Sequence, residues 1–319
     1  MDWSLPPSVY DKVDLGSKWQ PFPIETFMPK KKDKLLVTSV RCEKAENQLM
    51  KILSSNLAKN LIKVRKDFLE MISKVAGQSI STLPVAGLLY DTLAIETYDN
   101  DFWWSNVWTV EQQLQILDQL KIIGDFDFEL RWSSKLLQKL RSGILIEQIY
   151  QNIKQFIDGT SNNRFYEYSA YDSTVAPLLH LIGSFNNKRI MFGSSVIFEL
   201  HQKNNDYFIK IYYLNSTYTE QPHLLNIGIC GGQSSCSYDS FYKSIKEFFI
   251  LDFEEECGNN NSPSNNNENV QDNYSSSSIT INIKNEKSWF KLVFYISFYV
   301  ILLSSIFYFL ILSIKNRTA

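Results

Sequence analysis

The chain has 319 residues, of which 44% are hydrophobic and 21% are charged, as in an ordinary globular protein. Its 32 Lys and Arg residues nearly balance its 34 Asp and Glu residues, so the net charge is −2. Because nucleic-acid binding needs a positive surface field, this balance excludes a nucleic-acid partner.

The first half of the sequence predicts mainly helices. Residues 1–40 are rich in proline and predict irregular structure, without the basic and apolar runs of a secretory signal peptide. Apolar residues at helical spacing predict a long helix over about 43–75, and further helices near 110–123 and 135–157. The aromatic and acidic stretch at 98–108 predicts a loop between them.

Strands enter in the second half. Residues 164–170, RFYEYSA, predict a strand, and a tight turn at 171–173 leads into an apolar helix that begins at Thr174. Residues 196–200 and 207–214 are rich in β-branched and aromatic residues and flank the turn-forming QKNND, which predicts a β-hairpin. Helices followed by strand, turn and helix indicate an α/β fold.

The composition changes abruptly after Cys257. Residues 258–288 are rich in Asn and Ser, which predicts a flexible tether. Residues 289–314 predict one transmembrane helix, because Leu292–Ile314 carries no charge and is long enough to span a hydrocarbon core of about 30 Å. The alternative interpretation of this apolar run is a buried helix of a soluble domain. Residues 315–319 remain as a short tail.

Asp172 is the candidate catalytic residue. It follows a predicted strand and precedes a helix N-terminus, where free backbone N–H groups and the helix dipole favour anions. A carboxylic acid at such a place can donate a proton to a leaving group. The alternative is that Asp172 caps the helix, since Asp is a favoured N-cap residue. The three histidines lack metal-ligand spacing and no cofactor motif occurs, so we expect neither metal nor cofactor.

Several segments resemble, in the right order, the histidine acid phosphatases of the lysosomal and prostatic type. YEYSAYDSTVAPLLHLIGSF is similar to the family's second active-site segment, Ser-Ala-His-Asp-Thr-Thr followed by an apolar helix. KWQPFPIET, YDTLAIETYDN and LRSGILIEQI resemble other family elements. The resemblance implies that residues 1–257 form a layered α/β sheet of the histidine-phosphatase type with a helical subdomain. The family's first strand and N-terminal active-site segment would be missing from this domain.

The resemblance also implies how the four cysteines pair. Cys42 and Cys257 match a long-range disulfide of the family, and Cys230 and Cys236 match its short disulfide loop. Structural disulfides form in oxidising compartments, so the domain is expected to be luminal or extracellular.

This orientation fixes the expected topology. The chain would be a single-pass membrane protein, at the cell surface or in an endolysosomal compartment, with the lipid bilayer as a partner and residues 315–319 in the cytoplasm. Asn215 and Asn273 each begin a glycan acceptor sequon on the luminal side.

The sequence departs from the family at its catalytic residues. The family signature Arg-His-Gly-x-Arg-x-Pro, whose His is the nucleophile and whose Arg residues bind phosphate, has no match in the 319 residues. Tyr171 occupies the position of a second, phosphate-binding His, whereas Asp172 keeps the position of the proton donor. A tyrosine carries no positive charge at acid pH. We therefore expect these 319 residues to be catalytically incompetent.

Two interpretations of the function follow. The first is an acid phosphatase that hydrolyses phosphomonoesters through a phosphohistidine, with its N-terminal part outside this sequence; the missing signal peptide favours it. The second is a pseudophosphatase that acts as a membrane-tethered binding ectodomain. Tyr171 favours the second, because a missing start would not alter an internal residue. The expected ligands are a small phosphomonoester or a phosphoprotein. The strand that ends at Ala170 would lack its family neighbour and leave an open sheet edge.

Overall fold

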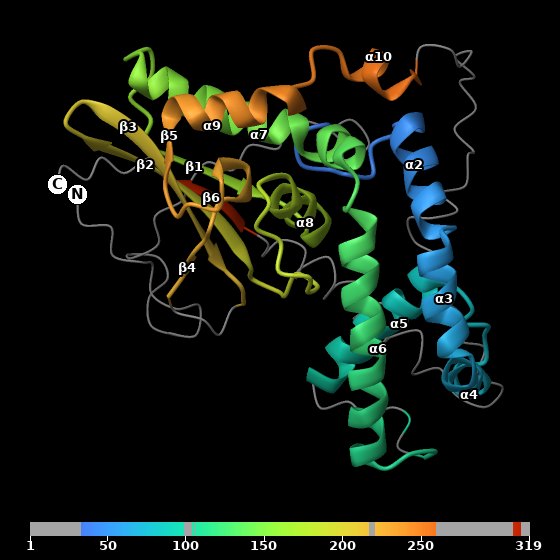
Figure 1. Cartoon of the computed structure of the whole chain (residues 1–319). Helices are drawn as coiled ribbons and strands as arrows, with labels where there is room; N and C mark the ends of the chain where they lie inside the picture. The colour runs from blue at the N-terminus through green and yellow to red at the C-terminus, as the bar shows by residue number, and fades with distance from the viewer. Residues whose placement is uncertain (1–32, 99–103, 105, 217–220, 260–308, 314–319) are drawn as a thin grey trace, which may run out of the picture.

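The computed structural model describes residues 33–98, 104, 106–216, 221–259 and 309–313. The first part of this structure is helical (Figure 1). Its helices are α2 (Glu43–Leu53), α3 (Asn56–Val64), α4 (Lys66–Ala76), α5 (Leu83–Tyr98) and α6 (Val110–Arg131).

Capping residues decide where these helices begin and end. The single helix predicted over 43–75 is three helices. The Ser55 hydroxyl accepts a hydrogen bond from the Ala58 N–H at 3.3 Å and starts α3, whereas the break at Arg65 before α4 has no side-chain cap. α4 ends at Gly77, whose φ of 68° is a left-handed conformation that terminates a helix. α6 begins at a capping box formed by Thr109 and Gln112 and runs eight residues past the predicted end at 123, to Arg131.

The rest of the described chain is α/β. Its helices are α7 (Lys135–Ile157), α8 (Asp172–Leu181), α9 (Tyr238–Ile245) and α10 (Phe253–Cys257), with short 3-10 turns η2 (Gly228–Cys230) and η3 (Lys246–Phe248). Its strands are β1 (Phe165–Ser169), β2 (Ser195–Lys203), β3 (Asp206–Leu214), β4 (His223–Leu224), β5 (Cys236–Ser237) and β6 (Phe309–Ser313).

The sheet has the strand order β1-β6-β2-β3-β4, and β5 pairs with β3. β2 and β3 form the predicted hairpin, in antiparallel register from Ser195–Leu214 to Lys203–Asp206. Asn204 and Asn205 make the two-residue turn with φ of 51° and 69°, as the favoured hairpin turn requires. Asparagine tolerates this left-handed conformation better than most residues, so the local sequence fixes both the turn and the register.

β6 is a difference from the sequence prediction. Residues 309–313 belong to the predicted transmembrane helix 289–314, but here they form a strand that lies antiparallel to β1 and parallel to β2. The physical reason is backbone pairing, because the facing edges of β1 and β2 would otherwise carry unpaired N–H and C=O groups. One edge of β1, in the strand predicted to end at Ala170, is therefore paired with β6, and β1 is the last strand of the described sheet on that side.

The other residues of that predicted helix lie outside the described residues. So do residues 260–288 of the predicted tether and the predicted tail at 315–319. In the part of the chain that the structure does describe, no helix is both long enough and apolar enough to cross a membrane.

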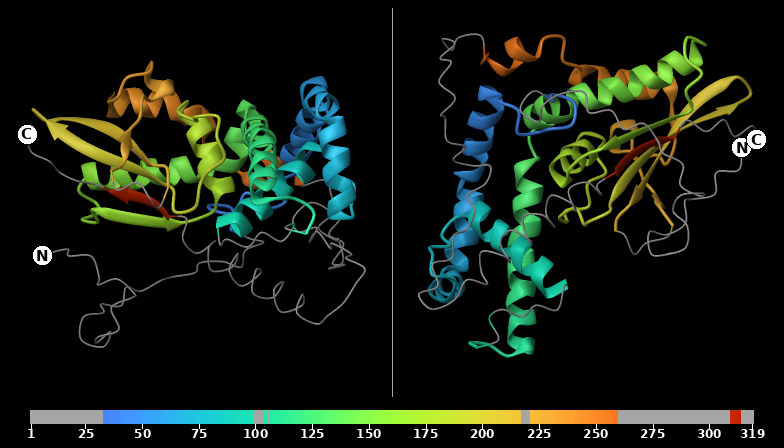
Figure 2. Two further views of the ribbon diagram at one scale, coloured as in Figure 1. Left: turned by 90° about the horizontal axis from the view of Figure 1, so that it is seen from below. Right: turned by 180° about the vertical axis from the view of Figure 1, so that it is seen from behind.

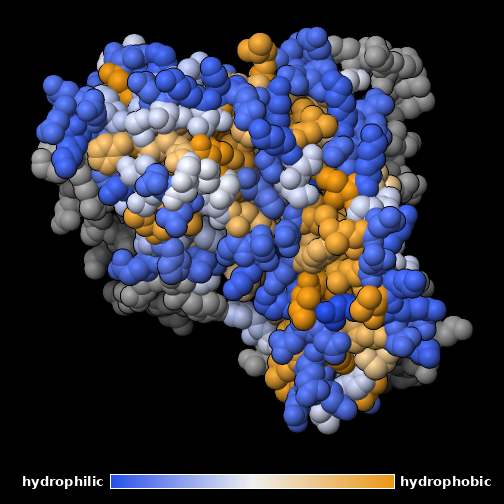
Figure 3. Space-filling model, in the orientation of Figure 1, coloured by the Kyte–Doolittle hydropathy of each residue, from blue (hydrophilic) through white to orange (hydrophobic). Residues whose placement is uncertain are grey.

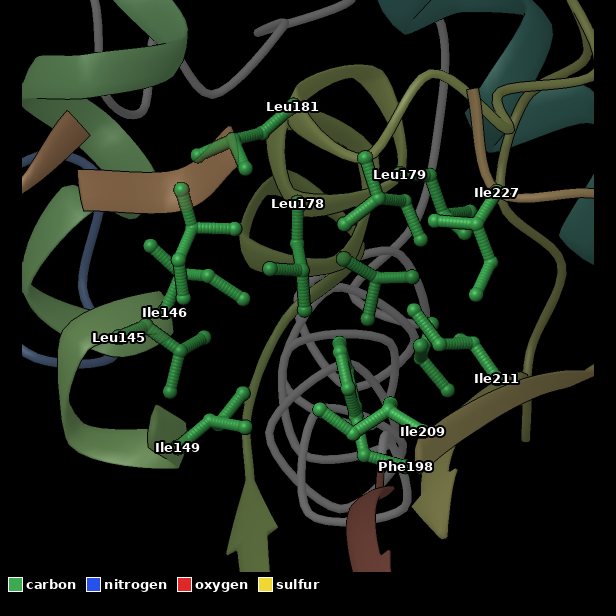
Figure 4. Close-up of a cluster of buried hydrophobic side chains, with 14 of the residues drawn as sticks. Leu145, Ile146, Ile149, Leu178, Leu179, Leu181, Phe198, Ile209, Ile211 and Ile227 are labelled. Atoms are coloured by element: carbon green, nitrogen blue, oxygen red, sulfur yellow. The ribbon is translucent and has the colours of Figure 1, made fainter. Parts of the chain in front are cut away.

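The main hydrophobic core lies between the sheet and the helices α7, α8 and α9 (Figure 4). Alternate residues of β2 and β3 face this core because successive side chains of a strand point to opposite faces. The side chains that fill it come mainly from these elements: Leu145, Ile146, Ile149, Leu178, Leu179, Leu181, Phe198, Ile209, Ile211 and Phe241.

The helical part has a separate core between α4, α5 and α6. Apolar side chains also continue to its surface, where Figure 3 shows hydrophobic residues over the helical part. Val64 is 84% exposed and Leu57 is 58% exposed on α3, and Ile122 on α6 is 53% exposed. In Figures 1 and 2, α8 lies between the sheet and this helical part. The start of α8 is therefore close to both halves of the fold.

Both disulfide pairs implied by the resemblance are present. Cys42 joins Cys257 across 215 residues of sequence, and Cys230 joins Cys236. The first bridge links the start of α2 to the end of α10, and both of its cysteines are fully buried. It closes the described domain on itself, so that the last helix of the α/β part is fastened to the first helix of the helical part.

Candidate active site around Asp172

Asp172 is the first residue of α8. The helix begins two residues earlier than the predicted start at Thr174, and its N-cap position is taken by Tyr171, in an extended conformation. The interpretation of Asp172 as the N-cap is therefore wrong. Asp172 Oδ1 accepts a hydrogen bond from the neighbouring N–H of Ser173 at 2.6 Å. A carboxylate in the first turn is also favoured by the helix dipole.

A buried threonine fixes the turn between β1 and α8. Thr174 is fully buried, and its hydroxyl donates a hydrogen bond to the carbonyl of Leu36 at 2.5 Å. The same hydroxyl accepts a hydrogen bond from the N–H of Tyr171 at 3.4 Å. Tyr171 packs against the small core that contains the Cys42–Cys257 bridge. The predicted pair Tyr171 and Asp172 is thus held by contacts to a segment about 135 residues earlier in the chain.

Arg189 brings a positive charge to Asp172. It lies in the loop between α8 and β2, and its Nη2 is 3.5 Å from Asp172 Oδ2 and 3.1 Å from Asp91 Oδ1. Its guanidinium carbon lies 4.6 Å from the ring centroid of Phe128, and its backbone N–H donates to Asp125 Oδ1 at 2.9 Å. One arginine therefore bridges α8 to α5 and α6.

The electrostatics of this cluster are dominated by partial burial. Burial raises the pKa of Asp91, the Arg189 guanidinium opposes that rise, and the charge of Asp172 adds to it. Burial likewise raises the pKa of the neighbouring Tyr90 hydroxyl, opposed first by Lys121. Ionised Asp91 is thus costly in the folded protein even though an arginine contacts it.

Replacing Asp91 by Asn should test this burial. A carboxyl whose pKa is raised by folding binds more protons in the folded state, so the native protein gains stability as pH falls through the folded pKa toward the ordinary value of 3.8. Asn resembles the protonated acid at every pH. We therefore expect the stability of Asp91→Asn, compared with that of the native chain, to be highest near neutral pH. This difference in stability should decrease at acid pH. Thermal unfolding of both chains over this pH range measures the difference, and a difference independent of pH would contradict it.

The three histidines lie elsewhere in the fold. His180, in the last turn of α8, stacks on Phe185 with ring centroids 4.0 Å apart, and burial lowers its pKa to about 4. His201 on β2 contacts Glu199 at 2.9 Å, and His223 is exposed on β4. Within the described residues, no group of three or more His, Cys, Asp or Glu side chains could hold a metal ion.

The sequence did not identify Arg189 and Asp91 as site residues. Asp91 belongs to YDTLAIETYDN, one of the segments that resemble the family, so that resemblance was an available signal. Arg189 lies in the loop segment NNKRI, where no motif or periodicity marks it. Of the predicted glycan acceptors, Asn215 directly follows β3, and Asn273 lies outside the described residues.

Comparison with known proteins agrees with this architecture. The sequence model of the histidine phosphatase superfamily (branch 2) matches residues 27–214, which is more than half of the chain and includes Tyr171, Asp172 and Arg189. The chain is 28% identical over 244 residues to a lysosomal acid phosphatase of Xenopus laevis, covering 75% of this chain and 55% of the relative.

Two further relatives give similar values. A putative acid phosphatase of Caenorhabditis elegans is 27% identical, with 76% of this chain and 56% of the relative covered. A prostatic acid phosphatase of Bos taurus is 27% identical, with 75% of this chain and 61% of the relative covered. The chain thus spans little more than half the length of these relatives. The matched segment contains the whole β1–α8 turn, and the chain belongs to branch 2 of the histidine phosphatase superfamily.

Proposed function

We propose that this chain is the part of a phosphomonoester-binding acid phosphatase domain that carries the leaving-group side of the site. The observation that supports this proposal is Asp172, at the first position of α8 within the family-matched segment. Its side chain is 26% exposed, so it can contact both the protein and a ligand. In this role its carboxylic acid would protonate the oxygen of the departing alcohol.

We further propose that these 319 residues do not hydrolyse phosphomonoesters by themselves. The sequence contains no Arg-His-Gly-x-Arg-x-Pro segment to supply a nucleophile and a phosphate clamp. Arg189 does not replace that clamp, because its single positive charge faces the two carboxylates of Asp91 and Asp172. When both carboxyls are ionised, these three groups together carry a net negative charge, and this charge repels a phosphate anion.

A binding role without catalysis is the second candidate function. Two observations favour it: Tyr171 stands where the family resemblance expects a histidine, and Asp172 already has Arg189 as an ionic partner. In that case the domain would be a pseudophosphatase that recognises a phosphorylated ligand or another partner from its tethered position. Catalytic turnover by a longer form of the protein distinguishes this candidate from the first.

Hydrolysis of a simple aryl phosphate at acid pH tests the proposal. We expect no turnover above the uncatalysed rate by the 319-residue chain, and Tyr171→His should not restore it, because one histidine supplies neither nucleophile nor clamp. Asp172→Ala serves as the matched control. Measurable hydrolysis that disappears in Asp172→Ala would contradict the proposed incompetence, since another residue of this chain would then act as the nucleophile.

A longer form of the protein gives the complementary test. If a segment with the Arg-His-Gly signature precedes these residues, the protein that includes it should hydrolyse the same aryl phosphate. Tyr171→His should raise that turnover, because it adds a positive charge beside the phosphate at acid pH. If the longer protein contains the signature and still fails to hydrolyse the aryl phosphate, in both its native and its Tyr171→His form, that result would favour the pseudophosphatase.

We also propose that the domain is luminal or extracellular and that residues 289–314 anchor it. The support is the uncharged run Leu292–Ile314 and the two disulfides, which require an oxidising compartment. Residues 309–313 cannot span a bilayer and pair as β6 at the same time, so anchoring implies that β6 leaves the sheet.

Glycosylation of the expressed protein measures this topology. Treatment with an N-glycosidase should increase the electrophoretic mobility of the chain through glycans on Asn215 or Asn273. Replacing both residues by Gln should remove the shift, and each single replacement shows which acceptor is used. A protein whose mobility responds neither to the enzyme nor to the double replacement would contradict a luminal domain.

A further inference from the structure

Arg189 makes a set of contacts that the proposed function does not yet use. Its side chain is only 14% exposed, and Nη2 lies within ion-pair distance of both Asp91 on α5 and Asp172 on α8. The guanidinium also lies over the ring of Phe128 on α6, and the backbone N–H of Arg189 donates a hydrogen bond to Asp125 of the same helix. These contacts to α5, α6 and α8 hold Arg189 in place from three helices.

The ion pair between Arg189 and Asp172 differs from an exposed ion pair because the arginine side chain is already ordered by other contacts. Exposed pairs contribute little because long side chains must be ordered in water to form them. Here the planar guanidinium is already ordered by the ring of Phe128 and by the Asp91 carboxylate at 3.1 Å, so the contact to Asp172 requires little further ordering. Lysine could not reproduce this arrangement, because its ammonium is a point charge that lacks the planar group placed over the Phe128 ring.

We propose that Arg189 is a positioning residue, which selects one orientation of the Asp172 carboxylate and ties it to the helical pair α5–α6. The inference rests on the proposed function in one respect only, namely that Asp172 is the group that acts on the ligand. It adds that the site is assembled from both halves of the fold. A movement of α5 or α6 relative to α8 would then change the orientation of Asp172.

The protonation of this cluster involves a defined set of groups. The charged or titratable side chains that face Arg189 or its partners are Tyr90 and Asp91 on α5, Lys121 and Asp125 on α6, and Asp172 on α8. Lys121 pairs with Asp125 at 2.5 Å, whereas Asp91 and Asp172 both form ion pairs with the Arg189 side chain. Protonation of Asp91 would weaken its ion pair with Arg189, while the ion pair of Arg189 with Asp172 could remain.

Carboxyl NMR of the full 319-residue chain, labelled with ¹³C at aspartate, tests this inference without any ligand. Three-bond couplings report the side-chain rotamer of Asp172, and a pH titration reports Asp91. In Arg189→Met we expect Asp172 to change from one rotamer to an average of several. We also expect the titration midpoint of Asp91 to move to higher pH, because Arg189 lowers the pKa of Asp91 in the native chain.

Arg131→Met is the matched control. Arg131 makes a two-nitrogen contact to the buried Asp127 on the same helix, at 2.8 and 3.1 Å, but it does not contact Asp172. Its removal should lower stability and leave the rotamer of Asp172 unchanged. An unchanged Asp172 rotamer in Arg189→Met, or the same averaging in Arg131→Met, would overturn the inference.

A second variant covers the case in which Arg189→Met does not fold. Arg189→Lys keeps the charge but loses the planar group that lies over Phe128, so Asp172 should again be averaged. A single rotamer in this variant would overturn the inference. Because the readout contains no phosphate ester, it is independent of the hydrolysis tests. The rotamer of Asp172 and the hydrolysis of an aryl phosphate are therefore measured separately. Failure of the positioning inference can be told apart from failure of the proposed function.

Discussion

Replacing both Cys42 and Cys257 by Ala should lower the free energy of unfolding by about 5 kcal/mol, which is the largest effect we expect from any pair of substitutions. The bridge closes a loop of 215 residues, and in the chain-entropy account a longer loop restricts the unfolded state more. The bond also fastens the end of α10 to the start of α2, so its loss should free both ends of the described domain. Denaturant unfolding under non-reducing conditions gives the value.

The second disulfide provides the matched control for this prediction. Cys230 and Cys236 are six residues apart, so replacing both by Ala should cost only about 2 kcal/mol by the same argument. Peptide mapping without reductant should recover each pair separately. Equal losses for the two double variants would contradict the loop-length account, and a Cys42–Cys230 peptide would contradict the fold itself.

Replacing Gly143 by Ala should destabilise the protein by about 3 kcal/mol, although alanine favours a helix more than glycine does. Gly143 lies in α7 against η3, and an added Cβ would come 2.2 Å from the carbonyl oxygen of Phe248 and 3.1 Å from Ile250 Cγ1. A backbone oxygen cannot rotate away as a side chain can, so α7 and the segment after η3 would have to separate. This steric cost exceeds the gain of about 1 kcal/mol from helix propensity.

The adjacent Ser142 is the control for Gly143. It is buried in the same helix, and its hydroxyl has no hydrogen-bond partner among the residues that the structure describes. Ser142→Ala removes a buried polar group without adding volume, so we expect a neutral or slightly stabilising effect. Thermal unfolding of the two variants should therefore differ clearly. Similar stabilities would show that η3 can move away from α7 at little cost.

Local patterns in the sequence determined several parts of this protein. The helix predicted over 135–157 has the same bounds as α7, and the strand predicted over 164–170 contains β1. The hairpin of β2 and β3 was predicted because β-branched and aromatic residues flank the turn-forming QKNND, and the structure places its turn at the two asparagines. Each of these elements depends on residues close together in sequence, so the sequence alone carries the information.

The family resemblance supplied long-range information that periodicity could not. The pairing of Cys42 with Cys257 was implied by the matched segments and is present in the structure. The place of Asp172 beside a helix N-terminus was predicted from the local strand, turn and helix pattern, and it too is present. The start of α8 was predicted two residues late, because two hydrogen bonds that fix the turn are not visible in a local pattern. The Thr174 hydroxyl donates to the Leu36 carbonyl and accepts from the Tyr171 N–H.

Only the tertiary structure decided the surroundings of Asp172 and the neighbour of β1. Arg189 and Asp91 are 98 residues apart in sequence, yet Nη2 of one lies 3.1 Å from Oδ1 of the other. The apolar run that predicted a membrane helix supplies β6, because unpaired strand edges bind any extended segment that reaches them. Hydrophobic periodicity shows which face of a segment can be buried. Contacts between distant segments depend instead on which strand edges and charged groups elsewhere in the fold still need a partner.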